Sequence, residues 1–159
     1  MRKSIMMVLV LGLMVLGFAA MSSAQGGPKI EKVWAPAEVN YGSVLKVYIK
    51  ATDPEGDMRW VVVSAGKGDK PTGSVPIRLG KDMKKDLNGF VYYDTLRAPQ
   101  KNVSGTAYIM IEDQKGNESE VMKVAVKVVA QGAKAEKPPA DFQEVAIGPV
   151  LIDAIQRSY

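Results

Sequence analysis

The sequence predicts an all-β fold, an antiparallel sandwich of two sheets. Between residues 29 and 129, short segments with alternating apolar and polar side chains follow one another, which is the pattern of half-buried strands. Clusters of glycine, proline, asparagine and aspartate separate these segments at short spacing. No helical period occurs among them, and seven strands are expected in about 100 residues.

The first three strands are expected at 30–34, 43–52 and 58–65. The strand at 43–52 is the clearest, because apolar and polar residues alternate along its length. It ends at the turn 53–57, where a proline and a glycine reverse the chain. The strand at 58–65 is apolar on both faces, as expected for a strand in the centre of a sheet.

The other four strands complete the two sheets. A short strand at 74–79 is expected at a sheet edge, because Pro76 has no N–H to donate to a neighbouring strand. The segment 89–96 has a run of aromatic and β-branched residues with high strand propensity. The last two strands are expected at 104–113 and 122–128, joined by a tight turn at 114–117.

Residues 1–24 have the pattern of a cleavable secretory signal peptide. Arg2 and Lys3 form the positive start, an apolar run follows at 5–18, and small residues at 22–24 fit a signal peptidase. A membrane anchor is the alternative, but the apolar run is shorter than the roughly 20 residues that a spanning helix needs. We therefore expect an exported protein, periplasmic or extracellular at the cell surface, with no transmembrane segment after cleavage.

Composition excludes several functions. The chain has 21 basic and 17 acidic residues, and the two basic residues of the signal leave 19 against 17 without a basic stripe, so no nucleic acid is expected as a partner. Cysteine and histidine are both absent, which excludes disulfides, thiol nucleophiles, imidazole bases and the usual zinc or copper ligands. We therefore expect no enzyme, no catalytic residue and no organic cofactor.

Two turns carry a family resemblance. The run Ala51–Asp57 (Ala-Thr-Asp-Pro-Glu-Gly-Asp) and the run Ile111–Asn117, followed by alternating valines, resemble bacterial immunoglobulin-like domains of the cadherin-like and PKD-like kind. The resemblance implies a seven-stranded antiparallel immunoglobulin-like β-sandwich, here at 25–129. It also implies an adhesion, carbohydrate-binding or spacer module, because such domains commonly have these roles.

The same turns contain the candidate metal ligands. In a sandwich of this topology the two turns emerge at one end, so their carboxylates are expected to converge. Oxygen ligands in this number are what calcium prefers, and acidic turns of cadherin-like domains bind it. The alternative is that the aspartates only bond nearby backbone amides and hold the turns. The candidate calcium ligands are Asp53, Glu55, Asp57, Glu112, Asp113 and Asn117.

Aromatic residues offer a second candidate surface. Trp60 is expected in the core, as a central-strand tryptophan of such sandwiches, rather than in a sugar-stacking platform. Tyr92 and Tyr93 are adjacent and must face opposite ways. Tyr93 and Tyr48 are therefore candidates for surface contacts.

A linker is expected at 130–140, and an apolar tail follows at 141–159. A strand is expected at 144–147 and a short helix at 150–157, neither stable alone. The tail either folds back over an open edge of its own domain or docks on a partner, for example by adding a strand to another subunit. The candidate partner-binding residues are Phe142, Val145, Ile147, Val150, Leu151 and Ile155.

Together these observations predict an exported, non-enzymatic protein-binding or structural module of the cell envelope that binds through its loops and its tail. Its partner would be an envelope or extracellular protein, or a second copy through the tail. The alternative is a calcium-dependent adhesion or carbohydrate-binding module.

Overall fold

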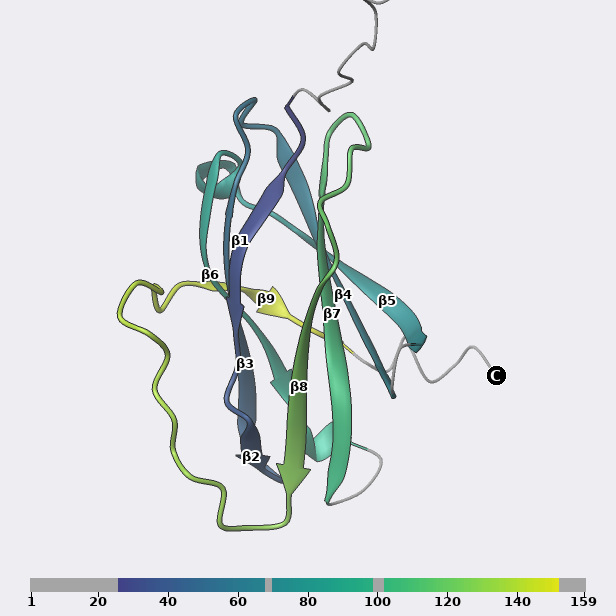
Figure 1. The fold of residues 1–159 in the computed structure, drawn as a ribbon, viewed down its shortest axis with the longest axis vertical. Coiled ribbons are helices and arrows are strands. Elements are labelled where there is room, and N and C mark those ends of the chain that lie inside the picture. The colour runs from purple at the N-terminus through teal and green to yellow at the C-terminus, as the bar shows by residue number, and fades with distance from the viewer. Residues whose placement is uncertain (1–25, 68–69, 99–101, 152–159) are drawn as a thin grey trace, which may run out of the picture.

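The computed structural model describes residues 26–67, 70–98 and 102–151. They form nine strands and two short 3-10 helices, so the expected all-β fold is confirmed (Figure 1). The helices are η1 (Lys81–Met83) and η2 (Thr95–Arg97). The strands are β1 (Lys29–Trp34), β2 (Glu38–Asn40), β3 (Val44–Thr52), β4 (Met58–Lys67), β5 (Lys70–Arg78), β6 (Asp86–Asp94), β7 (Val103–Asp113), β8 (Met122–Val129) and β9 (Ala146–Pro149).

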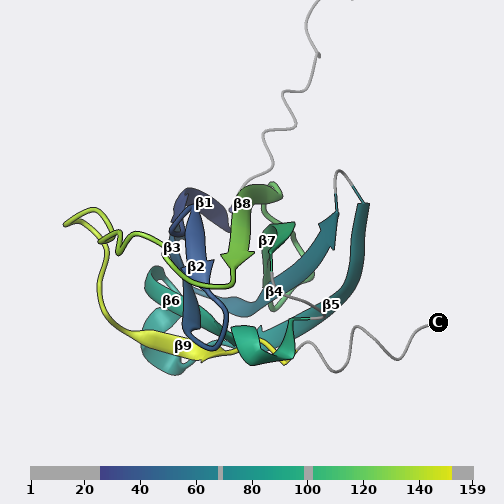
Figure 2. The same cartoon turned by 90° about the horizontal axis from the view of Figure 1, so that it is seen from below.

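The strands form two packed sheets. One sheet has four strands in the order β1-β3-β6-β9, and the other has five in the order β2-β8-β7-β4-β5. Figure 2 shows the two layers from one end, facing each other. β1, β3 and β6 take the places of strands A, B and E of an immunoglobulin domain, and β4, β7 and β8 take those of C, F and G. The strand order is therefore immunoglobulin-like.

The prediction of seven strands, all antiparallel, was wrong in two places. β2 pairs in parallel with β8, and β9 pairs in parallel with β6. β2 arises because the segment containing Pro36 lets the chain leave the four-stranded sheet after β1 and join the edge of the other sheet. β9 comes from the tail, and the chain between β6 and β9, which includes β7, β8 and residues 130–145, supplies the long crossover that a parallel pair requires.

Other strand predictions are confirmed. β4 lies between β7 and β5, as its two apolar faces indicate, and β5 with Pro76 lies at the sheet edge. The inward face of β3 is also as expected, since its alternate apolar residues are buried between the sheets. β9 lies two residues later than the strand that we expected at 144–147.

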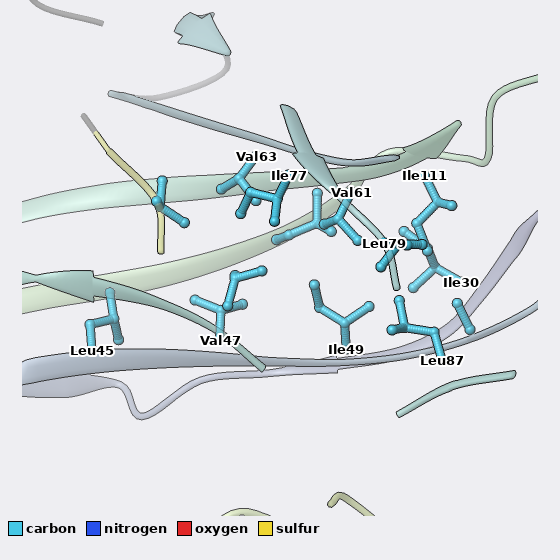
Figure 3. Packing of buried hydrophobic residues seen from close by; sticks show 14 of the residues in the cluster. Ile30, Leu45, Val47, Ile49, Val61, Val63, Ile77, Leu79, Leu87 and Ile111 are labelled. Atoms are coloured by element: carbon cyan, nitrogen blue, oxygen red, sulfur yellow. The ribbon is translucent and has the colours of Figure 1, made fainter. Parts of the chain in front are cut away.

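The core lies between the two sheets. Side chains from β3 and β4 point toward one another across this space (Figure 3). Each fully buried aliphatic side chain stabilises the fold by roughly 1.5–3 kcal/mol, which matters because the chain has no disulfide. The principal core residues are Ile30, Leu45, Val47, Ile49, Met58, Val61, Val63, Leu87, Val91, Ile109 and Ile111.

The expected signal peptide lies outside the described residues, as does most of the helix expected at 150–157. Among the residues that the structure describes, no helix combines the length and the apolar character needed to cross a bilayer. Residues 130–145 contain neither strand nor helix and run along the outside of the sandwich from the end of β8 to β9 (Figure 1). The four-stranded sheet thus continues into the segment that we described as the tail.

Candidate functional site

Two turns meet at one end of the sandwich, as the sequence predicted. The backbone N–H of Gln114, in the β7–β8 turn, donates a hydrogen bond to the carbonyl oxygen of Asp57, in the β3–β4 turn, at 3.0 Å. Carboxylate oxygens of Glu55, Asp57 and Asp113 lie within 4.8 Å of one another. We call Asp53, Glu55, Asp57, Asp113 and Lys115 the acidic pole.

Asp53 and Asp113 hold the two turns in the same way. The carboxylate of Asp53 accepts from the backbone N–H groups of Glu55, at 3.0 Å, and Asp57, at 3.2 Å. The carboxylate of Asp113 accepts from the backbone N–H groups of Lys115 and Asn117, both at 2.8 Å. The Asn117 side chain adds a third bond to Asp113, at 2.7 Å. Both aspartates are buried, so these bonds compensate for the loss of water.

The pKa values at the pole move in opposite directions. Burial alone would raise the pKa of Asp113, but the hydrogen bonds from Asn117, Lys115 and Gly116 hold it below its ordinary value. Desolvation is the largest cause that raises the pKa of Asp57. The Asp53 carboxylate, which can accept a hydrogen bond from a protonated Asp57, and the negative charge of Asp113 raise it further.

The pole has one unsatisfied atom and one resident cation. Among the described residues, Oδ1 of Asp57 is buried without a hydrogen-bond partner. The ammonium group of Lys115 forms an ion pair with Glu55, which raises the pKa of the lysine. Gly26 also lies here, since a Cβ on it would be 2.8 Å from a carboxylate oxygen of Glu55. The arrangement brings together carboxylate oxygens, the kind of ligand that hard cations prefer.

The six candidate calcium ligands are only partly brought together. Asp53, Glu55, Asp57 and Asp113 lie at the pole, and Asn117 bonds to Asp113. Glu112 lies one residue earlier in β7 and is not part of the carboxylate group. It pairs in register with Trp60 and forms an isolated β-bridge with Glu118.

A second cluster lies on the outer face of the four-stranded sheet. Tyr48, Phe90 and Phe142 are buried there, although they point away from the main core. The ring centroid of Tyr48 lies 5.4 Å from that of Phe90 and 5.7 Å from that of Phe142, with Trp34 and Tyr92 packed around them. Phe142 belongs to the tail, so we call this surface the tail-covered face.

Ion pairs and hydrogen bonds fix the tail on this face. Lys32 pairs with Asp141 at 3.1 Å, and Lys46 pairs with Glu144 at 2.6 Å. The hydroxyl of Tyr48 donates to the other oxygen of Glu144 at 2.5 Å. These partners lower the pKa values of Asp141 and Glu144, through Lys32 and Lys46 first. Burial, and next the bond to Glu144, raises the pKa of Tyr48 far above its ordinary value.

The Asn88 side chain binds the tail through its main chain. Its Nδ2 donates to the carbonyl oxygen of Asp141, and its Oδ1 accepts from the backbone N–H of Gln143, both at 2.9 Å. The N–H of Phe90 donates to the carbonyl oxygen of Val145 at 2.8 Å. Asn88 therefore extends the ladder between β6 and the tail beyond β9.

β9 closes the open side of the sandwich. Ile147 and Val150 pack against the main core, and the N–H of Val150 donates to the carbonyl oxygen of Tyr92 at 2.8 Å. A Cβ on Gly148 would lie 2.7 Å from Cγ2 of Ile77 in β5, so β9 bridges the gap between β6 and β5 (Figure 2). The tail thus folds back on its own domain.

Of the candidate partner-binding residues, Phe142, Ile147 and Val150 contact the sandwich itself. Val145 and Leu151 remain 40% and 51% exposed, and Ile155 lies outside the described residues.

Several aromatic predictions were wrong. Trp60 is not in the core, because a register irregularity between Met58 and Trp60 puts Met58, Val61 and Val63 on the inner face. Trp60 lies half-buried on the outer face. Tyr48 is only 3% exposed, and Tyr93 packs against the main core.

Sequence reasoning missed the residues that hold the tail. Lys32 and Lys46 looked like ordinary surface residues of strands, and Asn88 lay just before the strand expected at 89–96. Gly89 in β6 carried a usable signal, because a glycine inside a strand often marks a close approach of another backbone. A Cβ there would lie 2.5 Å from the carbonyl oxygen of Val145.

Comparisons with known proteins give likenesses of fold only. No family model matches the sequence, and no curated protein matches it significantly. The PKD domain of an M14-like peptidase from Thermoplasmatales archaeon SCGC AB-540-F20 has 18% identity and a TM-score of 0.44, covering 65% of this chain and 96% of that domain. The CARDB domain of a Pyrococcus furiosus protein, in complex with di-metal ions, has 11% identity and a TM-score of 0.38, covering 65% and 89%.

An engineered protein aligns with 15% identity and a TM-score of 0.35, over 67% of this chain and 20% of that one. These scores carry no argument about function, and the fold assignment rests on the strand order of the chain itself. By that order, the domain is an immunoglobulin-like β-sandwich.

Proposed function

We propose that the chain is an exported, non-enzymatic protein-binding module of the cell envelope. The observation that carries this proposal is the seating of residues 141–151 on the four-stranded sheet. An extended segment is bound there by strand pairing, by a buried ring and by two ion pairs. Sandwich domains bind partners by the same means when a segment of another protein adds to a sheet edge.

The seating of the tail determines which of its residues are available to bind a partner. Phe142 and Val150 stabilise the sandwich in cis, whereas Val145 and Leu151 leave apolar side chains exposed at either end of β9. The region around β9 is therefore our proposed contact surface, and exposed Val145 and Leu151 are the tail residues that can reach a partner without detachment.

The binding role is tested by affinity purification of the tagged chain from its native envelope. Two variants are compared with the wild type: Gly89→Ala, which removes the space used by the carbonyl of Val145, and Gly105→Ala. At Gly105 a Cβ would meet only ordinary contacts, the nearest atom being the Gly66 carbonyl oxygen at 3.6 Å. We expect the yield of a specific envelope protein to change several-fold with Gly89→Ala alone. The role is refuted if no specific envelope protein co-purifies with any of the three chains.

Export is tested separately. The mature N-terminus should be Gln25, and the protein should fractionate outside the cytoplasm. A chain that retains Met1 and stays in the cytoplasm would disprove this part of the proposal.

A second candidate function, a calcium-dependent adhesion or carbohydrate-binding module, is favoured by the acidic pole. Three carboxylates lie within 4.8 Å, and one of their oxygens is buried without a partner among the described residues. Calcium at millimolar concentration would then raise the melting midpoint by a few degrees, and Asp57→Asn would remove that effect. An unchanged midpoint in the wild type ends this candidate.

A further inference from the structure

We propose that the tail-covered face is a binding site for an extended segment of another protein. In that segment an acidic residue directly precedes an aromatic residue, and a second acidic residue lies two positions after the aromatic residue. The tail, with Asp141, Phe142 and Glu144, is its resident occupant. This inference rests on the proposed protein-binding function and adds the chemistry of the bound segment.

Part of the site binds any extended backbone. Asn88 bonds the main chain on both sides of Phe142, and the main chain of Phe90 and Tyr92 bonds Val145 and Val150. None of these bonds depends on the side chain of the bound residue. They set the direction of the segment, parallel to β6, without selecting its sequence.

The side chains around Phe142 favour an aromatic ring. Phe142 is only 8% exposed, and its ring lies 5.7 Å from that of Tyr48. The ammonium group of Lys32 lies 5.3 Å from the ring centroid of Phe142, on the scale of a cation–π contact. An aliphatic side chain would forfeit both interactions, so these contacts favour an aromatic ring at this position.

Charge complementarity selects the flanking residues. Lys32 binds the carboxylate directly before the ring, and Lys46 with the Tyr48 hydroxyl binds the carboxylate two residues after it. Lys46 is itself fixed over the Phe90 ring, 4.3 Å from its centroid. Lys46 therefore has a contact on the sheet that does not involve the tail, whereas Lys32 contacts Asp141 and Phe142, which both belong to the tail.

The strand pairing of the resident tail with β6 is short and irregular. β9 has four residues, two of which are Gly148 and Pro149, and its register with β6 is irregular between Phe90 and Val91. Residues 130–145, which join it to β8, form no strand or helix. The tether keeps the tail at an effective concentration on the order of millimolar, so an outside segment binds well only when the tail is weakened or when it fits better.

The test uses the full chain and a fluorescent synthetic peptide of residues 138–151 as the probe. Two variants weaken the resident tail: Phe142→Ala removes the ring, and Glu144→Lys removes the exposed carboxylate without touching the core. We expect the peptide to bind each variant at least about tenfold more tightly than it binds the wild type. A peptide in which Phe142 is replaced by alanine should lose most of this affinity.

A charge reversal tests the lysine contact. In the Phe142→Ala chain, adding Lys46→Glu should weaken binding of the peptide about tenfold, and a peptide carrying Glu144→Lys should recover most of the loss. A purely structural role of Lys46 would not be rescued by the reversed peptide.

The unmodified chain provides a readout that does not depend on variants folding. Excess peptide should accelerate hydrogen exchange at the Val150 N–H, which is bonded to Tyr92, in a dose-dependent way. The proposal is overturned if exchange at Val150 stays unchanged at millimolar peptide and neither variant binds the peptide more tightly. Because these measurements involve no export and no envelope protein, their failure is distinguishable from failure of the proposed function.

Discussion

The acidic pole and the tail-covered face both join carboxylates to the sandwich, but by different means. At the pole, Asp53 and Asp113 accept hydrogen bonds from backbone groups two and four residues further along the chain. On the tail-covered face, Asp141 and Glu144 pair with lysines far away in the sequence, on β1 and β3. Each turn of the pole is held by local hydrogen bonds, whereas the tail contact is assembled entirely from distant parts of the chain.

This difference indicates which contacts are expected to break only when the whole domain unfolds and which can break separately. A buried local turn forms with the sheets that it connects, so damage there is expected to destabilise the whole domain. A distant contact between a tethered segment and an exposed face can open alone, so damage there is expected to release the tail and leave the sandwich folded. Four predictions test this separation.

The largest effect is expected from Asp113→Ala. The substitution leaves two backbone N–H groups and the Asn117 amide without their buried acceptor, and should lower the free energy of unfolding by about 3 kcal/mol. Chemical denaturation measures it, with Glu118→Ala, an exposed residue near the same turn, as the control. A loss no larger than that of the control would contradict the structural role of the pole.

Gly89→Ala should have the next largest effect and a different character. The added Cβ lies where the Val145 carbonyl approaches, so the tail is released and about 2 kcal/mol from burial of Phe142 is lost. Hydrogen exchange should speed up at Val150 but not at core residues such as Ile109. Gly105→Ala is the matched control. Equal protection at Val150 in both variants would show that the tail is not held as described.

Acidification should release the tail reversibly. The pKa values of Asp141 and Glu144 are lower when the tail is attached, so attachment is strongest above the ordinary carboxyl pKa of about 4 and weakens as the pH falls below it. Trp34 emission in a Trp60→Phe background reports the change, because Trp34 packs against Tyr48. A chain carrying Asp141→Asn and Glu144→Gln should lose this pH dependence, and an identical titration would argue against the two ion pairs.

The smallest effect is expected from Asp57→Asn. The raised pKa of Asp57 means that its charge opposes folding at neutral pH, and protonation at lower pH removes that cost. Without calcium, the substitution should slightly raise the melting midpoint at pH 7, with a difference that disappears in acid. A lowered midpoint at pH 7 would mean that the Asp57 charge is used by a partner, as a bound cation would require.

The sequence predicted the local features well. The turns 53–57 and 113–117, the alternation in β3 and the central place of β4 follow from residues close together in the chain. The shared end of the two turns followed from the expected sandwich topology. The prediction placed Trp60 in the core, but a register irregularity between Met58 and Trp60 inverts the alternation of inward and outward side chains in β4. No residue near Trp60 indicates this irregularity in the sequence. The sequence shows that the tail is apolar, but it does not show where the tail binds. The residues of β1, β3 and β6 that hold the tail become neighbours only after the sheet has formed.

The position of β9 in the chain sets an order of events during synthesis. A ribosome completes β1 to β8 before it reaches residues 146–150, so the nascent domain carries an unpaired β6 edge and an unsealed core beside Ile77 until the end. Exposed apolar surface and an unpaired strand edge make an incomplete domain of this kind prone to aggregation. The core is therefore closed only after β9 has been made.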